Sequence, residues 1–351
     1  WRSVAVVNVD APVKYFTAAE GGVSHFNYLR DNLLLTWMHS RLFLGFALRL
    51  PVLAWRKLQK AGTERAAEGR GFAIPVLCYH SSNVRGASYE TNDHLALEAD
   101  LKTLGQRGYQ IIPLPLLVAI LRGEHAAAKL SGRKLVGLSC DDGVNLDWHD
   151  ADQEDGSKVA AFNTILDKSR QWLSQWGEGP RAVAFVIASP EARIIMEQTC
   201  VGHPVLQEDW WAECAASGVL GIANHSWDHV HDNLPVVCQQ DNKKGSFLHI
   251  ATQTDAERQI VLAQQYIDSK TAEKALRLFA YPYGDVSPWL RDEYFPSRTA
   301  THGMLAAFAT GGAAVRPGAN IWALPRFVCG EHWHNPGEFA ALLDAVERGE
   351  K

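Results

Sequence analysis

From residue 73 to the C-terminus, short apolar runs alternate with longer amphipathic stretches. The short runs predict strands at 74–79, 134–139, 182–187, 220–223, 278–280, 306–310 and 322–328. The amphipathic stretches predict helices at 94–107, 113–122, 157–176, 208–217, 252–270 and 337–348. Such alternation indicates parallel strands joined by crossover helices, and therefore an α/β sheet or barrel.

The first 60 residues follow a different pattern, with a short β-like run at 4–9 and many Leu, Phe and Trp residues between 33 and 55. Arg41 and Arg49 interrupt the apolar stretch, so it lacks the span of about 20 uncharged residues that a transmembrane helix needs. Basic residues beside large apolar ones suit helices on a membrane surface, or equally helices packed on the main domain or a partner. We therefore expect a helical appendage (1–60), a polar linker (61–72) and a main domain (73–351).

Composition narrows the class of protein. The chain has 351 residues, 47% of them hydrophobic, and a net charge of −5. These values predict a folded globular protein with a sizeable core and give no support for nucleic-acid binding. Its 6 cysteines have no C-x-x-C spacing, which favours buried single thiols over a disulfide framework or a zinc ribbon. The chain begins at Trp1 without a signal-like segment, so we expect a processed product or a fragment and leave its compartment open.

Candidate chemistry follows the predicted strands. His225 and His229 are four residues apart, so on a helical turn both imidazoles would face one point. A carboxylate from Asp142 would complete three ligands and leave a divalent metal with open positions. Asp141 would then lie within reach of a metal-bound water as a base. A His-x-x-x-His pair alone is often incidental, and Asp-Asp-Gly alone is typical of turns, but their combination after strands favours a hydrolytic metal site at one barrel rim.

Five segments together resemble the polysaccharide deacetylases of carbohydrate esterase family 4. They are 74–80 (IPVLCYH), 139–143 (SCDDG), 225–229 (HSWDH), 279–284 (FAYPYG) and 324–326 (LPR). Their order and spacing agree with that family over roughly residues 73–345. The resemblance implies a distorted (β/α) barrel that removes N-acetyl groups from an N-acetylhexosamine polysaccharide or oligosaccharide, such as the N-acetylglucosamine polymers of the cell envelope.

The resemblance also implies roles for individual residues. Asp142, His225 and His229 would bind the metal, usually zinc, although cobalt or nickel would also suit these ligands. Asp141 would take a proton from the metal-bound water. The metal and the backbone N–H of Tyr283 would hold the oxyanion of the tetrahedral intermediate.

Supporting roles are implied for three neighbours of these residues. Ser226 would steady the loop between the two histidines. Tyr281 and Pro282 would form a wall of the substrate groove.

For one arginine and two tryptophans near the expected groove, the sequence allows two interpretations each. Arg326 is assigned to the substrate groove, where it either pairs with Asp141 and keeps it charged, or is structural. Trp148 and Trp227 lie beside motif loops, where flat aromatic faces suit sugar rings, but packing is an equally good interpretation.

The general acid is the role for which this chain departs from the usual family pattern. Many family members carry an arginine where this chain has Ala280, and the usual C-terminal Leu-x-His acid motif is hard to find. The early pair Tyr79-His80 resembles the poly-N-acetylglucosamine deacetylase type, which makes His80 the candidate acid. His332 and His334 are its competitors.

The N-terminal segments 22–26 (GVSHF) and 30–32 (RDN) faintly resemble the C-terminal tail of a family 2 glycosyltransferase. That resemblance implies contact with a glycosyltransferase or a membrane surface through residues 1–60. It also implies that the chain is a fragment of a longer synthase–deacetylase.

Two other functions compete with deacetylation. Two histidines and one carboxylate also form the ligand set of non-haem iron oxygenases, but Asp141 and the early Tyr-His pair have no role in that chemistry. A catalytically inactive, glycan-binding barrel is the other alternative. The presence of every proposed ligand and of the base argues against it.

Overall fold

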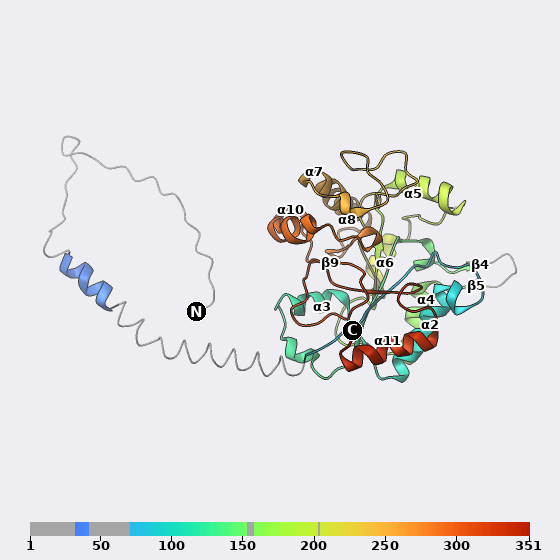
Figure 1. Cartoon of the computed structure of the whole chain (residues 1–351), viewed down its shortest axis with the longest axis horizontal. Coiled ribbons are helices and arrows are strands. Elements are labelled where there is room, and N and C mark those ends of the chain that lie inside the picture. Colours follow the sequence, from blue (N-terminus) through green and yellow to red (C-terminus); the bar gives the residue numbers. More distant parts are fainter. Residues whose placement is uncertain (1–31, 42–70, 153–157, 203) are drawn as a thin grey trace. The chain divides into compact units, whose positions relative to one another are not determined.

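The computed structural model describes residues 32–41, 71–152, 158–202 and 204–351. The chain divides into two units, Trp1–Ala66 and Ala67–Lys351, which are described separately. In the first unit residues 32–41 form a helix (Figure 1). The strand-like run at 4–9, the rest of the stretch 33–55 and nearly all of the linker lie outside the described residues. Among the residues that are described, no helix is both long and apolar enough to cross a membrane.

The second unit is built around one parallel sheet. Its strands are β1 (Val76–Tyr79), β2 (Gln110–Ile111), β3 (Leu135–Cys140), β6 (Ala182–Val186), β7 (Leu220–Asn224), β8 (Leu278–Ala280), β9 (Ala306–Phe308) and β10 (Phe327–Val328). The strand order is β10-β1-β3-β6-β7-β8-β9, and β2 also pairs with β3. Every pairing in this sheet is parallel.

The sheet curls so that its two ends approach each other. Ala309 donates its backbone N–H to the carbonyl oxygen of Leu324 at 2.8 Å, and the N–H of Leu324 in turn donates to the carbonyl oxygen of Ala307 at 2.9 Å. Leu324 lies just before β10, so the chain that follows β9 leads back towards the opposite edge of the sheet. This architecture is the distorted (β/α) barrel that the sequence predicts.

Helices surround the sheet (Figure 1). The α-helices are α2 (Asp93–Gln106), α3 (Leu114–Leu121), α4 (Phe162–Lys168), α5 (Pro190–Met196), α6 (Trp211–Ser217), α7 (Gln253–Ala256), α8 (Ala263–Thr271), α9 (Phe295–Ser297), α10 (Thr299–His302) and α11 (Pro336–Arg348). The π-helical segments are η6 (Glu197–Val201), η8 (Glu257–Leu262) and η10 (Leu290–Tyr294). The 3-10 turns are η2 (Tyr89–Thr91), η3 (Ala127–Leu130), η4 (Asn145–Asp147), η5 (Ser169–Gln171), η7 (Phe247–His249) and η9 (Pro282–Gly284). A short antiparallel pair, β4 (Ala151–Asp152) and β5 (Lys158–Val159), stands apart from the main sheet.

Local sequence explains where several helices begin. The side chain of Asn92 accepts the N–H groups of His94 and Leu95 at the start of α2. Ser189 caps α5 and Asn335 caps α11, and a proline follows each of them as the first helical residue.

The predicted helix at 157–176 is wrong in its length, because α4 ends at Lys168 and a 3-10 turn follows.

The sheet is buried on both faces. All residues of β1, β3, β6 and β7 are buried, as expected for parallel strands covered by helices. Three clusters of buried hydrophobic side chains form the core of this unit. The strands are therefore fixed in position, and the loops at their carboxyl ends rest on a rigid support.

Candidate metal centre

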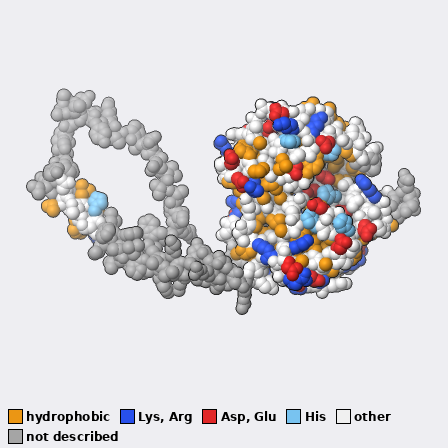
Figure 2. Space-filling view, viewed as in Figure 1, with side chains coloured by type: hydrophobic (Ala, Val, Ile, Leu, Met, Phe, Trp, Pro, Cys, Tyr) orange, Lys and Arg blue, Asp and Glu red, His pale blue; other side chains and the backbone are white. Residues whose placement is uncertain are grey.

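The predicted site residues follow the carboxyl ends of four strands. His80 follows β1, Asp141 follows β3, His225 follows β7 and Tyr283 lies in the turn after β8. Because parallel strands end at the same rim, these side chains meet at one cavity of about 230 Å³. Its lining residues are His80, Asp141, Asp142, His225, His229, Tyr283, Gly284, Thr310, Val328 and Glu331. Figure 2 shows histidine and acidic side chains gathered on the visible face of this unit.

Asp142, His225 and His229 converge on a common point. Their ligand atoms all lie within 4.8 Å of one another. The Nε2 atoms of His225 and His229 lie 3.7 Å and 3.9 Å from Oδ1 of Asp142. Such separations leave room for one ion between the three side chains.

The protonation pattern of the histidines suits a cation. Nδ1 of His225 lies 2.9 Å from the carbonyl oxygen of Ala280, which can only accept a hydrogen bond, so Nδ1 carries the proton. Nε2 of His225 therefore faces the Asp142 carboxylate and is the ring nitrogen available to a cation between them. Burial, followed by the charges of His225 and His231, holds the pKa of His229 well below its ordinary value and keeps that ring neutral. Two imidazoles and one carboxylate form a donor set that fits Zn²⁺.

The two histidines do not lie on a helical turn, so that part of the sequence interpretation is wrong. Residues 225–230 form a loop, and both Ser226 (φ 72°) and His229 (φ 60°) have left-handed backbone conformations. The Ser226 hydroxyl accepts the N–H of His229 at 3.0 Å, and Asn224 accepts the N–H of Ser226 at 2.8 Å. This network turns the loop back on itself and brings the two imidazoles together.

Gln259 also holds this loop, and the sequence analysis did not find it. Its side-chain oxygen accepts the N–H groups of Trp227 and Asp228 at 3.2 Å and 3.4 Å, and its amide donates to Asp228 at 2.7 Å. Gln259 is fully buried within the π-helical segment η8. Because it lies about thirty residues after the histidines, no local motif marks it.

Backbone strain is concentrated at this centre. Of the eight non-glycine residues with positive φ in the described part of the chain, five lie in its loops. They are Asp142 (76°), Ser226 (72°), His229 (60°), Val230 (49°) and Tyr283 (60°). Such conformations cost free energy and persist where the surrounding structure imposes them, as it often does at functional sites.

Asp141 is a buried carboxylate paired with Arg326. The guanidinium donates to both carboxylate oxygens, each at 2.7 Å. Burial by itself raises the pKa of Asp141, but the charge of Arg326 and then of His225 outweigh it and hold that pKa well below its usual value. Arg326 is 0% exposed and touches Asp141 rather than the cavity, so the structure places it beneath the site and not along a substrate groove.

The motif after β8 divides into a buried and an exposed part. Tyr281 is fully buried and donates its hydroxyl to the carbonyl oxygen of Trp322 at 2.9 Å, and Pro282 is also buried. Tyr283 is 43% exposed, and its ring centroid lies 4.4 Å from that of His229. Of these three residues only Tyr283 lines the cavity.

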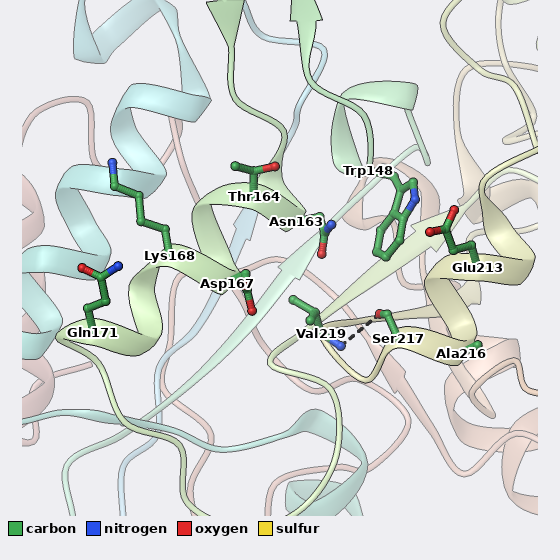
Figure 3. A pocket seen from close by; sticks show the side chains of 10 residues that line it. All are labelled: Trp148, Asn163, Thr164, Asp167, Lys168, Gln171, Glu213, Ala216, Ser217 and Val219. Carbon is green, nitrogen blue, oxygen red and sulfur yellow. Dashed lines mark hydrogen bonds between the residues drawn. The ribbon is translucent and has the colours of Figure 1, made fainter.

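The two predicted groove tryptophans lie elsewhere. Trp227 packs edge-on against Tyr266, with 5.8 Å between the ring centroids. Trp148 lines a separate hollow of about 680 Å³ between α4 and α6, together with Asn163 and Glu213 (Figure 3). None of these residues lines the cavity at the metal centre.

Among the three histidines considered as the acid, only His80 lines the cavity. Its backbone N–H donates to Asp93 at 2.8 Å, which fixes the segment after β1. Nδ1 of His332 accepts the N–H of Val328 at 3.0 Å, and His334 is exposed beside Glu338. Of these three candidates, His80 is therefore the one that shares the cavity with Asp141.

Two cavity residues had no signal in the sequence. Thr310 follows β9 and Glu331 follows β10, and both line the small cavity. Glu331 and His80 also line a larger hollow of about 1190 Å³ that continues past Arg85 and Asp152. This larger hollow offers room for an extended ligand beside the metal centre.

Comparison with known proteins finds a family model that matches part of the second unit. Residues 177–294 match the family model described as polysaccharide deacetylase. The matched segment includes His225, His229 and Tyr283. No curated protein matches the chain.

Solved structures with a similar fold are also deacetylases by name. The deacetylase PplD of Streptococcus pyogenes, in complex with acetate, is 14% identical, with a TM-score of 0.50 over 78% of this chain and 98% of its own. A polysaccharide deacetylase of Bacillus cereus is 16% identical, with a TM-score of 0.47 over 78% of this chain and 69% of its own. The deacetylase domain of BpsB from Bordetella bronchiseptica is 13% identical, with a TM-score of 0.46 over 74% of this chain and 96% of its own. At these identities the likeness to PplD establishes the fold alone.

The family match and the fold have one functional consequence. Residues 177–294 match a polysaccharide deacetylase domain, and this match supports a hydrolytic deacetylase activity for the protein.

Proposed function

We propose that the protein removes N-acetyl groups from an N-acetylhexosamine-containing polysaccharide or oligosaccharide, with a divalent metal held by Asp142, His225 and His229. The convergence of these three side chains within 4.8 Å is the observation that carries the proposal. A metal bound there supplies Lewis acidity to a water molecule and to the acetamide carbonyl. Zinc is the proposed ion, and cobalt or nickel are the alternatives for the same donors.

Asp141 is the proposed general base. Its bidentate contact with Arg326 orients the carboxylate and keeps it charged, so it can accept a proton from the attacking water. Oδ2 of Asp141 lies 4.0 Å from Nε2 of His225, and this proximity supports a base acting next to the proposed ligands.

His80 and Tyr283 complete the proposed mechanism. His80 faces the same cavity as Asp141 and would donate a proton to the leaving amine. The backbone N–H of Tyr283 would stabilise the oxyanion of the tetrahedral intermediate, and the strained conformation of that residue orients the peptide group. Ser226 supports the loop between the ligating histidines through its bond to His229.

The polymer itself is proposed from the early Tyr79-His80 pair, which resembles the poly-N-acetylglucosamine deacetylase type. The larger hollow next to the cavity supports an extended chain over a single sugar. Such polymers belong to cell-envelope pathways.

The proposal is tested by acetate release from chitooligosaccharides and from poly-N-acetylglucosamine, with and without a chelator. Asp141→Asn is expected to lower turnover by about 10²–10⁴-fold, the usual contribution of a positioned base, and to keep its metal. Asp142→Ala is expected to lose metal on dialysis, as metal analysis would show. Asp167→Asn removes an exposed carboxylate far from the cavity and serves as the control. Equal turnover in wild type and Asp141→Asn would reject Asp141 as the base.

We also propose the division into an appendage (1–60), a linker (61–72) and a deacetylase domain (73–351), with the appendage contacting a membrane surface or a glycosyltransferase. Within the described helix 32–41, large apolar side chains such as Leu33 (66%) and Trp37 (61%) are exposed. Sedimentation of the full chain with anionic lipid vesicles tests the membrane contact. A chain that stays in the supernatant at low salt would contradict it.

A further inference from the structure

A second group of metal-ligating side chains lies beside the first. Cys78, His80 and Asp141 offer a sulfur, a nitrogen and an oxygen atom that all lie within 4.8 Å of one another. Asp141 is adjacent in the chain to Asp142, a ligand of the first site. The proposed deacetylation gives no role to Cys78.

Strand geometry brings these three side chains together. Alternate residues of a strand point to the same face, so Cys78 and His80 project in the same direction from the end of β1. Cys78 pairs with Ser139 in the parallel register of β1 and β3. Asp141 lies two residues beyond Ser139 and therefore projects beside His80.

The donors and their burial suit a soft or borderline metal. Cys78 is 0% exposed and Asp141 is 5% exposed, while His80 lines the cavity through which an ion would enter. A thiolate, an imidazole and a carboxylate are ligands that Zn²⁺ accepts, and the thiolate also favours softer ions such as Cd²⁺.

Arg326 makes this site weaker than the first. Its guanidinium already donates to both oxygens of Asp141 and opposes a second positive charge nearby. Binding would form bonds from the metal to Cys78, His80 and Asp141 and would release the thiol proton to solvent. No oxidation or reduction takes part.

We propose that Cys78, His80 and Asp141 form a second, weaker metal site that inhibits the enzyme when excess metal fills it. Inhibition follows because the ion occupies both Asp141, the base, and His80, the acid. This part of the inference rests on the proposed function, whereas metal binding by Cys78 does not.

Binding is tested without any activity measurement. The full chain, loaded with one equivalent of Zn²⁺, is titrated with Cd²⁺ while sulfur-to-cadmium charge-transfer absorption is recorded in the ultraviolet. The first site contains no sulfur, so exchange of its Zn²⁺ for Cd²⁺ gives no such band.

Wild type is expected to develop the band, and Cys78→Ser and Cys78→Ala are expected to lose most of it. Cys140→Ser, which removes an equally buried thiol from the neighbouring strand, is the matched control and should keep it. A band of equal strength in wild type and in both folded Cys78 variants would overturn the site, as would no band in wild type.

Activity is tested in the same proteins with increasing Zn²⁺. Wild type is expected to lose acetate release by about 10²-fold or more at saturation, as expected when an acid or base is blocked. Both Cys78 variants should resist this inhibition while matching wild type at one equivalent. Equal inhibition of wild type and both variants would refute the inhibitory role and leave deacetylation intact. If no acetate is released at one equivalent, the proposed function fails, and the cadmium band still decides whether Cys78 binds metal.

Discussion

At the scale of single residues, the Asp141–Arg326 pair determines the charge at the centre. Both partners are buried, and both carboxylate oxygens accept hydrogen bonds from the guanidinium. The pair therefore keeps a proton acceptor ionised in a place where burial alone would favour its neutral form.

Arg326→Met tests that pairing. The variant leaves a buried carboxylate without its cation, and we expect the free energy of unfolding to fall by about 3–5 kcal/mol. Adding Asp141→Asn should restore part of this loss, because the uncompensated charge is removed. Urea denaturation measures both effects. Arg348→Met, which removes an exposed guanidinium beside Glu350, is the control and should change stability little. A loss in Arg326→Met no larger than in the control would contradict the pairing argument.

Asp100 gives a pH-dependent prediction away from the metal centre. It accepts hydrogen bonds from Tyr79, Tyr89 and Trp333, yet burial raises its pKa to about 7. In the unfolded chain Asp100 has the ordinary aspartate pKa of ~4. Between pH ~4 and pH ~7 the folded protein therefore binds more protons at Asp100 than the unfolded chain does, so the free energy of unfolding falls as the pH rises. The contribution of protonated Asp100 to the free energy of unfolding is complete below pH ~4 and lost as the pH rises through ~7. Over this range the free energy of unfolding falls by up to about 1.4 kcal/mol per pH unit.

Asp100→Asn removes this titration. Compared with wild type, the variant is expected to lose less stability between pH 5 and pH 8, as urea denaturation at each pH would show. Parallel profiles for the two proteins would mean that Asp100 titrates near its ordinary pKa.

At the scale of elements, the loop after β7 is shaped by a helix remote in sequence. Gln259 of η8 binds the backbone of Trp227 and Asp228, and Asn224 donates its side-chain amide to the carbonyl oxygen of Ile260 in the same segment. A π-helical turn is a common feature of functional sites, and here it carries the residues that order the ligand loop.

Gln259→Leu should therefore weaken the metal site without removing a ligand. We expect metal affinity to fall by about 10–100-fold, as is typical when residues that orient ligands are lost. Competition with a chromophoric chelator measures the affinity. Gln253→Leu, an exposed change near the start of the same helical stretch, is the control. Unchanged affinity in Gln259→Leu would show that the histidine loop does not depend on this support.

At the scale of the whole molecule, the described residues that form the core and the candidate site belong to the second unit. The three hydrophobic clusters begin at Phe72, and every proposed ligand lies beyond residue 77.

A chain reduced to residues 67–351 is therefore expected to unfold cooperatively at a temperature close to that of the full chain and to keep its acetate release. Calorimetry and the acetate assay test this expectation. Loss of cooperative unfolding in the shorter chain would show that residues 1–66 contribute to the stability of the second unit.

The strands and the order of the motifs could be predicted from local sequence. Buried parallel strands need continuous apolar runs, and 278–280 was predicted with the bounds that β8 has. Asp141, His225 and Tyr283 directly follow such runs, so their common rim follows from the parallel topology. The turn that carries the histidines was predicted incorrectly, because spacing alone does not reveal left-handed backbone conformations imposed by neighbours.

The sequence by itself determined the alternation of parallel strands and helices and the donor types of the candidate metal centre, because apolar periodicity and residue chemistry are local properties. Only the tertiary structure decided that Arg326 lies beneath Asp141, that Gln259 holds the histidine loop and that Cys78 faces the base. Those contacts join segments up to 185 residues apart, and their geometry depends on how the sheet curls and packs rather than on any short pattern.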